Sequence, residues 1–237
     1  QAVAMPARFH GLLVAALAAA VLLPNLGGPP LWDDDEPRNA ACSLAMHATG
    51  DWIVPTFNGR LRVEKPALVN WLHLAGFAVA GVNETGARLG SALLTIATCL
   101  LTWRIGALVL NPAAGCWAGI VMATCLWTAV GGRAATPDPP LVFSTTLALW
   151  LFVRGGRVAG RDCTGWRSGP VRLTVGAAAA VGAPLGLAVL AKGPIGLALP
   201  VAAFLLFAWW QACLDPARDG SRAARLLAGA AAAGRGV

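Results

Sequence analysis

The stretch that decides the fold, residues 9–38, reads FHGLLVAALAAAVLLPNLGGPPLWDDDEPR. Its first part, residues 9–26, is a long apolar segment, and about 20 such residues are enough for a helix to cross a bilayer. The stretch ends in four consecutive acids, residues 33–36, followed by Pro37 and Arg38. Because a carboxylate cluster is costly inside lipid, we expect these acids to face water at the membrane surface.

The composition extends this interpretation to the whole chain. Of its 237 residues, 57% are hydrophobic and 12% are charged, whereas soluble domains carry about 25% charged residues. Further apolar segments cover residues 87–108, 113–131, 139–153, 173–191 and 194–213, and a seventh begins at Leu226. The sequence therefore predicts an all-α, polytopic bundle of membrane helices. We interpret residues 1–237 as the N-terminal part of one transmembrane domain whose C-terminal remainder is missing.

The charges of the loops predict the topology. The loop 154–172 carries five arginines and one aspartate, and the loop 214–225 carries three arginines. Both loops lie on the cytoplasmic side, as positively charged loops prefer, if the apolar stretch 67–81 is a surface or juxtamembrane helix that does not cross. The loop 27–86, with seven acids and four bases, then lies outside. The net charge of +7 follows from this topology and does not indicate a nucleic-acid partner.

This topology brings polar residues from four parts of the chain to the outer face. They are the pair Asp35-Glu36, the pair Glu64-Lys65, the segment 133–138 and Lys192. Chance could bring them together, but we interpret the convergence as a functional site. Asp35 is then a candidate general base, and Arg38 holds a phosphate or orients the carboxylate.

Each of these motifs also has a purely structural explanation. Acids followed by Pro37 suit the first turn of a helix, which we place over residues 38–49. Lys65 and Lys192 can extend to lipid headgroups, although both can equally bind the phosphate of a lipid substrate. Asp138, at the membrane edge, can form a structural ion pair with Arg133.

Seven motifs, in this order along the chain, resemble the bacterial aminoarabinose transferase/dolichyl-phosphate-mannose protein mannosyltransferase group of GT-C glycosyltransferases. They are Asp35-Glu36-Pro37-Arg38, Gly50-Asp51-Trp52, Asn58-Gly59, Glu64-Lys65-Pro66 with Trp71-Leu72, Arg88-Leu89 with Ser91-Ala92, Thr136-x-Asp138 and Lys192-Gly193-Pro194. The resemblance implies the N-terminal part of a GT-C fold, with juxtamembrane helices in an outer catalytic loop, residues 27–86.

The resemblance also implies a function. It predicts transfer of a hexosyl or pentosyl group from a polyprenyl-phosphate sugar to a lipid or protein acceptor, at the periplasmic face of the inner membrane. Asp35, Glu36 and Asp138 form the acidic catalytic set in this account. Arg38, Lys65 and Lys192 contact the donor phosphate. In some relatives the position that matches Glu64 helps to hold a metal ion, but the cofactor requirement of this chain stays unknown.

Three positions depart from the family pattern. Asn39 and Asn70 stand where the family usually has an aromatic residue, and Ala67 stands where it usually has proline. These positions lie near the expected site, so the sugar and the acceptor stay open. A polytopic transporter or lipid flippase is the alternative function, since it also needs outer charges and broken helices. Transporters, however, hold ionisable residues near the bilayer midplane, whereas these residues lie at the ends of segments.

Overall fold

The structure, a computed structural model, describes residues 7–158 and 173–213. Its helices are α1 Ala7–Leu22, α2 Asp35–Thr49, α3 Leu68–Ala80, α4 Glu84–Val109, α5 Pro112–Thr124, α6 Leu126–Gly131, α7 Asp138–Val158, α8 Val175–Lys192 and α9 Ile195–Cys213. Two short strands, β1 Thr56–Phe57 and β2 Arg60–Leu61, form an antiparallel hairpin between α2 and α3. The all-α prediction is confirmed.

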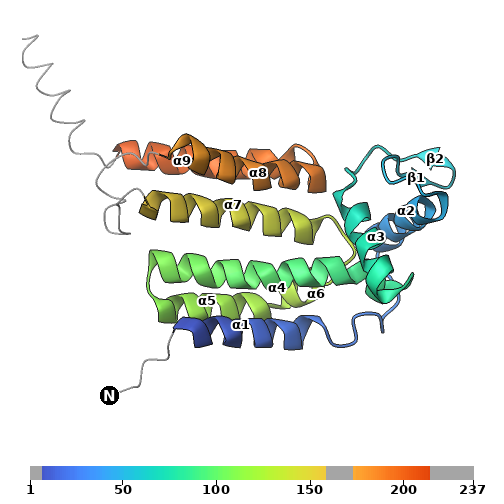
Figure 1. Cartoon of the computed structure of the whole chain (residues 1–237), viewed down its shortest axis with the longest axis horizontal. Coiled ribbons are helices and arrows are strands. Elements are labelled where there is room, and N and C mark those ends of the chain that lie inside the picture. Colours follow the sequence, from blue (N-terminus) through green and yellow to red (C-terminus); the bar gives the residue numbers. More distant parts are fainter. Residues whose placement is uncertain (1–6, 159–172, 214–237) are drawn as a thin grey trace, which may run out of the picture.

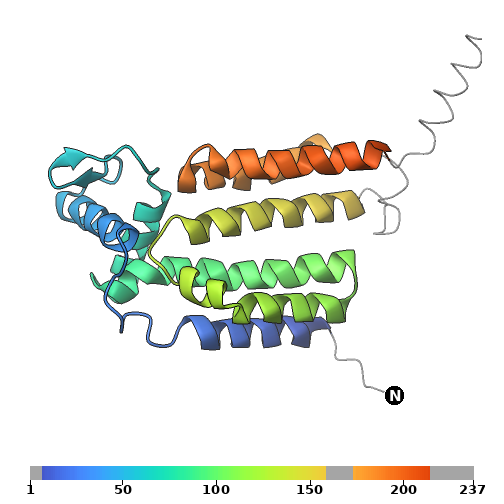
Figure 2. The same cartoon turned by 180° about the vertical axis from the view of Figure 1, so that it is seen from behind.

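The long helices run side by side and the outer-loop elements gather at one end (Figure 1 and Figure 2). α4 lies at the centre of the bundle, where it packs against α1, α5 and α7, while α7 also packs against α8. α2, α3 and the hairpin gather at one end of the bundle, where α3 packs against the start of α4. The stretch 67–81 therefore does not run through the bundle. This agrees with the prediction made from the charges of the other loops.

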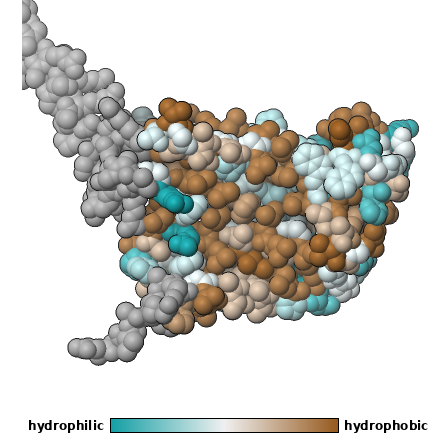
Figure 3. All heavy atoms as spheres, in the orientation of Figure 1, coloured by the Kyte–Doolittle hydropathy of each residue, from teal (hydrophilic) through white to brown (hydrophobic). Residues whose placement is uncertain are grey.

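The bundle has the surface expected of a membrane protein. Among the described helices, α4 and α8 are long and apolar enough to span a bilayer, and α1, α3, α5 and α9 contain shorter apolar stretches. Apolar side chains cover the middle of the bundle on the face shown in Figure 3, and hydrophilic residues gather mainly toward its two ends.

Several helix ends follow local rules that the sequence contains. The side chain of Asn83 accepts a hydrogen bond from the backbone N–H of Gly86 at 2.9 Å, which caps the N-terminus of α4. Gly193, with a φ of 73°, ends α8 in a conformation that glycine adopts without strain. α2 begins at Asp35, three residues before the predicted start, so that Asp35 and Glu36 lie inside its first turn.

Three of the predicted spans differ from the structure. The segment predicted as 9–26 ends earlier, because α1 stops at Leu22. The segment 113–131 is broken into α5 and α6 at Cys125, whose backbone is extended with a ψ of 129°. No glycine or proline marks the interruption, so no helix-breaking signal is visible in the sequence there. The segment 139–153 is longer than predicted, because α7 continues through Arg154 to Val158. The arginine-rich stretches 159–172 and 214–225 and the segment from Leu226 lie outside the described residues.

A close helix crossing fixes the outer elements on the bundle. A Cβ atom added to Gly76 of α3 would lie only 1.9 Å from the carbonyl oxygen of Gly86 in α4. Around this crossing lies a buried cluster of residues from α2, α3, α4 and the segment before α7, namely Met46, Leu74, Phe77, Ala87 and Ala135. These outer elements, namely α2, α3, the start of α4 and the segment before α7, therefore form a packed cap on the bundle. The cap can hold polar side chains in fixed positions.

Candidate active site

The cap is built around a buried ion pair between α2 and α4. Arg88 donates from Nε to Oε1 of Glu36 at 3.0 Å and from Nη2 to Oε2 at 2.7 Å. The side chains are 6% and 2% exposed respectively. A guanidinium group matches a carboxylate in this two-point geometry, and such charge-assisted contacts are strong.

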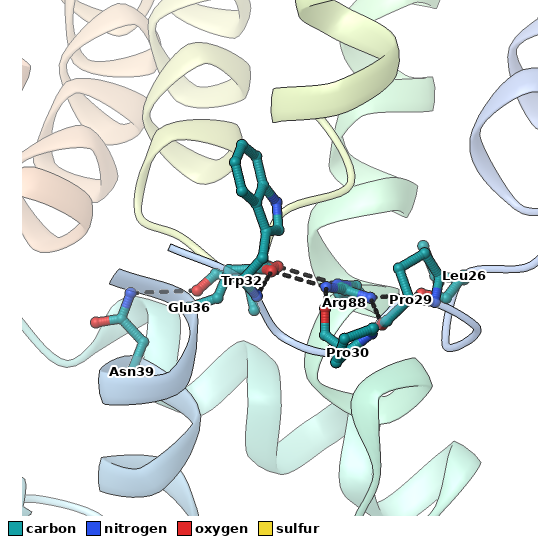
Figure 4. A network of polar contacts seen from close by, with 8 residues as sticks. Leu26, Pro29, Pro30, Trp32, Glu36, Asn39 and Arg88 are labelled. Atoms are coloured by element: carbon teal, nitrogen blue, oxygen red, sulfur yellow. Dashed lines mark hydrogen bonds and ion pairs between the residues drawn. The ribbon is translucent and has the colours of Figure 1, made fainter. Parts of the chain in front are cut away.

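The remaining N–H groups of Arg88 hold the segment that follows α1. Nη1 donates to the carbonyl oxygens of Leu26 at 3.1 Å and Pro29 at 2.7 Å, and Nη2 donates to that of Pro30 at 3.0 Å. A guanidinium group has five N–H donors, and here all five are engaged. Figure 4 shows the resulting network. Arg88 is thus committed to holding the protein together and has no donor left for a substrate.

Glu36 connects two further segments to the same network. Its Oε1 accepts the backbone N–H of Ala135 at 2.7 Å, and its Oε2 accepts that of Trp32 at 3.1 Å. Burial would raise the pKa of Glu36, but the hydrogen bonds from Arg88, Ala135 and Trp32 outweigh it and hold the pKa below its ordinary value. The carboxylate is charged and fully occupied as an acceptor.

A pocket of about 500 Å³ opens beside this network. Asp35, Asp138 and Lys192 all line it, together with Trp32 and Thr136. Asp35 and Asp138 are the first residues of α2 and α7, and Lys192 is the last residue of α8. Acids at helix N-termini and a base at a C-terminus are favoured by the helix dipoles. The structure thus brings together three residues that are far apart in sequence.

Two of the carboxylates that line the pocket, Asp35 and Asp138, have lysine partners. Nζ of Lys65 lies 3.6 Å from Oδ2 of Asp35, and Lys192 donates to Oδ1 of Asp138. Arg133, the partner that the sequence suggested for Asp138, instead donates to the carbonyl oxygen of Pro24 at 2.7 Å. This expectation was wrong because proximity in sequence does not determine where the long Arg133 side chain points.

Arg38 and Glu64 lie apart from this arrangement. Nη2 of Arg38 contacts Oδ2 of Asp34 at 3.2 Å, and both side chains are exposed. Glu64 is also exposed and lies 3.5 Å from Nε of Arg62. Within residues 7–158 and 173–213, no three His, Cys, Asp or Glu side chains are grouped so that they could hold a metal ion. The residues around Glu64 therefore do not fit a metal site in the part of the chain that is described.

The two asparagines that depart from the family pattern belong to one buried network. Oγ of Ser43 lies 3.0 Å from Oδ1 of Asn70, 2.9 Å from the carbonyl oxygen of Asn39 and 2.9 Å from Nδ1 of His73. Nδ2 of Asn39 donates to the carbonyl oxygen of Ala135 at 3.2 Å. Burial lowers the pKa of His73 to about 4, so its ring is neutral. The asparagines thus link α2, α3 and the segment before α7.

Sequence reasoning missed the structural roles of Trp32 and Arg88. Arg88 was visible only as part of the Arg88-Leu89 motif, and nothing in the motif indicated which carboxylate it contacts. Trp32 precedes the acidic run directly, and this position was its only signal.

The chain matches known proteins along most of its length. Residues 12–228 match the family described as dolichyl-phosphate-mannose-protein mannosyltransferase. An undecaprenyl phosphate-alpha-4-amino-4-deoxy-L-arabinose arabinosyl transferase 2 of Pseudomonas fluorescens is 32% identical over 84% of this chain and 35% of its own length. An uncharacterized protein of Aquifex aeolicus is 33% identical over 73% of this chain and 36% of its own length.

Solved structures show the same fold. ArnT from Cupriavidus metallidurans bound to undecaprenyl phosphate aligns with a TM-score of 0.71 and 26% identity, over 83% of this chain and 35% of that protein. The apo state of ArnT aligns with a TM-score of 0.70. The chain thus spans about a third of the length of the relatives it matches.

Proposed function

The chain belongs to the dolichyl-phosphate-mannose-protein mannosyltransferase family, and on this premise we propose that the protein is a membrane glycosyltransferase. It moves a sugar from a polyprenyl-phosphate donor to a lipid or protein acceptor. The observation that carries the proposal is the pocket in which Asp35 and Asp138 meet Lys192, with Lys65 paired to Asp35. Carboxylates and cations side by side suit a reaction that moves a proton and releases a phosphate.

The donor class follows from the relatives. Curated relatives are named as undecaprenyl-phosphate aminoarabinose transferases, and the structural relative ArnT binds undecaprenyl phosphate. We propose a polyprenyl-phosphate sugar for this protein, with a pentosyl group favoured over a hexosyl group by the relatives' names. The site is proposed to face the periplasm from the inner membrane, since the arginine-rich loops 154–172 and 214–225 favour the cytoplasm.

The proposed reaction is a single displacement at the anomeric carbon. An acceptor hydroxyl forms the new glycosidic bond, the bond between the anomeric carbon and the phosphate oxygen breaks, and the hydroxyl proton passes to Asp35. Polyprenyl phosphate leaves with the electron pair of the broken bond. Lys65 and Lys192 stabilise the charge that develops on it, which is the kind of electrostatic contribution that usually dominates. Arg38, at the exposed edge, supplies a further positive charge.

The ion pairs suggest how binding of the donor frees Asp35 to act as the general base. Without donor, Lys65 neutralises Asp35 and Lys192 neutralises Asp138. A donor phosphate that enters the pocket competes for the lysines, because it offers several charged oxygens. When Lys65 turns to the phosphate, an oxygen of Asp35 becomes free to accept the acceptor's proton.

Glu36 has a different part in this proposal. Its two oxygens already accept four hydrogen bonds, so it is poorly suited to accept a proton in the reaction. We propose that Glu36 is a positioning residue: it binds the backbone N–H groups of Trp32 and Ala135 and so holds Trp32 and the neighbours of Ala135, Ala134 and Thr136, at the pocket wall. The catalytic carboxylates are then Asp35 and Asp138.

Transport is the less favoured alternative. A transporter would hold its ionisable residues near the bilayer midplane, whereas Asp35, Lys65, Asp138 and Lys192 all lie at the cap end of the bundle. This position suits chemistry at a membrane surface better than passage through it.

The proposal is tested with the protein in membranes, by following release of free polyprenyl phosphate from a panel of polyprenyl-phosphate sugars. Native lipids and proteins serve as acceptors. The wild type should release polyprenyl phosphate from at least one donor. Lys65→Ala should slow the release about a hundredfold or more, the order expected for loss of a transition-state charge contact. Arg60→Ala, which removes an exposed cation of the same outer loop, is the control and should retain activity once corrected for folded protein. Absence of release from every donor, together with donor-independent movement of lipid across the membrane, would support transport instead.

A further inference from the structure

We propose that the indole of Trp32 is the surface on which the sugar ring of the donor rests. The proposal deepens the function proposed above and rests on it. It assigns to a single residue the recognition of the sugar, as distinct from recognition of the lipid phosphate.

Trp32 lines the pocket together with Asp33 and Asp35, and its side chain is not buried. The residue is 61% exposed, yet it forms part of the wall of the same pocket that contains Asp35 and Asp138. In Figure 4 its indole stands away from Arg88 and from the network that holds its backbone. A large flat side chain that is exposed within a pocket offers a face to a ligand.

The backbone of Trp32 is fixed more firmly than that of an ordinary surface residue. Its N–H donates to Oε2 of Glu36 at 3.1 Å, and Arg88 holds the carbonyl oxygen of Pro30, two residues earlier, at 3.0 Å. The next residue, Asp33, has a φ of 62°, which few residues other than glycine adopt, although aspartate tolerates it. This reversal allows Trp32 and Asp35 to line one pocket. Because the backbone is held in advance, only the side chain of Trp32 has to lose freedom on binding.

The pocket around Trp32 offers partners for both parts of the donor. Asp33, Asp35 and Asp138 line it together with Lys192, and Lys65 pairs with Asp35. The cations attract the phosphate, which leaves the carboxylates and the indole for the sugar. A sugar ring combines hydroxyl or amino groups, which carboxylates bind, with a C–H face that packs on an indole. An amino group on the sugar would gain further from the aromatic face, since cations are attracted to it.

Trp52 provides a comparison within the same outer loop. It is 57% exposed, and its carbonyl oxygen accepts the indole N–H of Trp71 at 2.7 Å, but it is not among the residues that line the pocket. Trp52 has the position expected of an interfacial anchor. A comparison of Trp32 with Trp52 therefore distinguishes a role in the pocket from a role at the membrane surface.

The test compares binding of two lipids to the protein in nanodiscs. One is a polyprenyl-phosphate sugar that the wild type uses, and the other is the same polyprenyl phosphate without the sugar. Trp32→Leu, which keeps apolar bulk but lacks a flat ring, should weaken binding of the sugar-bearing lipid roughly tenfold, the order expected for loss of one aromatic contact. It should change binding of the bare lipid phosphate less than twofold. Trp32→Phe should keep most of the wild-type affinity for the sugar-bearing lipid. Trp52→Leu should change binding of neither lipid.

The outcomes distinguish failure of the Trp32 proposal from failure of the glycosyltransferase function on which it rests. Equal weakening of both lipids by Trp32→Leu would mean that Trp32 contacts the lipid or supports the fold, and would overturn the platform. No weakening of either lipid would overturn it as well. If the wild type bound neither lipid, the proposed function would fail along with the platform. Thermal unfolding of each variant in detergent checks that the cap remains folded.

Discussion

Glu36 of α2 and Arg88 of α4 are joined by two parallel hydrogen bonds of 3.0 and 2.7 Å inside the outer cap. Through this pair the segment after α1, the start of α2, the start of α4 and the segment before α7 meet at one point. Asp35, the adjacent residue in sequence, instead pairs with Lys65 at the pocket. Successive helix residues point about 100° apart, so two neighbouring acids serve two purposes.

The Glu36–Arg88 pair should contribute strongly to stability. Arg88→Lys replaces the planar fork by a single ammonium group, which cannot reach the five acceptors that Arg88 satisfies. Breaking a buried pair while leaving one charge behind costs about 3–5 kcal/mol, and we expect Arg88→Lys to approach that range. The thermal unfolding midpoint in detergent measures the effect.

Arg38→Lys is the matched control for this change. Arg38 pairs with Asp34 on the surface, where ion pairs contribute about 0–1 kcal/mol, so its midpoint should hardly move. Equal midpoints for both variants would show that the buried pair does not hold the cap together.

His73 should make the stability of the protein depend on pH. Its pKa is lowered from 6.5 to about 4 in the folded protein. Between about pH 4 and pH 6.5, therefore, His73 is mainly protonated in the unfolded chain and mainly neutral in the folded one. The stabilisation is complete above pH 6.5 and falls as the pH drops toward 4, by up to about 3 kcal/mol at about 1.4 kcal/mol per pH unit. The unfolding midpoint should therefore fall over this range.

His73→Gln should flatten this part of the pH profile, whereas His47→Gln, at an exposed position of α2, should leave it unchanged. The lowered pKa of Glu36 adds a loss of stability in more acidic solution, below its ordinary value of 4.5. A profile for His73→Gln that still falls as steeply between pH 6.5 and 4 would assign the effect to other groups.

The crossing of α3 and α4 should not tolerate a larger residue at Gly76. Gly76→Ala places a methyl group against the carbonyl oxygen of Gly86, and overpacking of this kind costs about 1–3 kcal/mol. Gly186→Ala in α8 is the control, because a Cβ there meets nothing within 4 Å and alanine favours a helix. If the two variants unfolded at the same temperature, α3 would not be seated on α4 as described.

The sequence predicted most of the long-range architecture because membrane spans and their loops follow simple rules. Asn83, Gly193 and the apolar segments determined where α4, α8 and α9 begin or end. The surface position of 67–81 could be inferred from the arginines of distant loops. The break at Cys125 could not, because its backbone groups are satisfied by the turns on either side and its side chain carries no signal.

The sequence predicted that some of the candidate residues lie together, but it predicted neither their contacts nor the separate positions of Arg38 and Glu64. Asp35, Asp138 and Lys192 do share a pocket, as the predicted topology suggested. The pairing of Glu36 with Arg88 depends on how α2 packs against α4, over a separation of 52 residues. The network of Asn39, Ser43 and Asn70 likewise depends on how α2 lies across α3, which no local pattern encodes.

The most direct test of the account is the rate at which polyprenyl phosphate is released from the proposed donor, by the protein in membranes, when Asp35 is changed to asparagine. Asp35→Asn keeps the size of the side chain but removes its capacity to accept a proton. A positioned general base contributes a factor of about 100 to 10,000, so we predict a fall of that size in kcat, with the folded fraction unchanged. Release at the wild-type rate by a folded Asp35→Asn variant would contradict the placement of the reaction in this pocket.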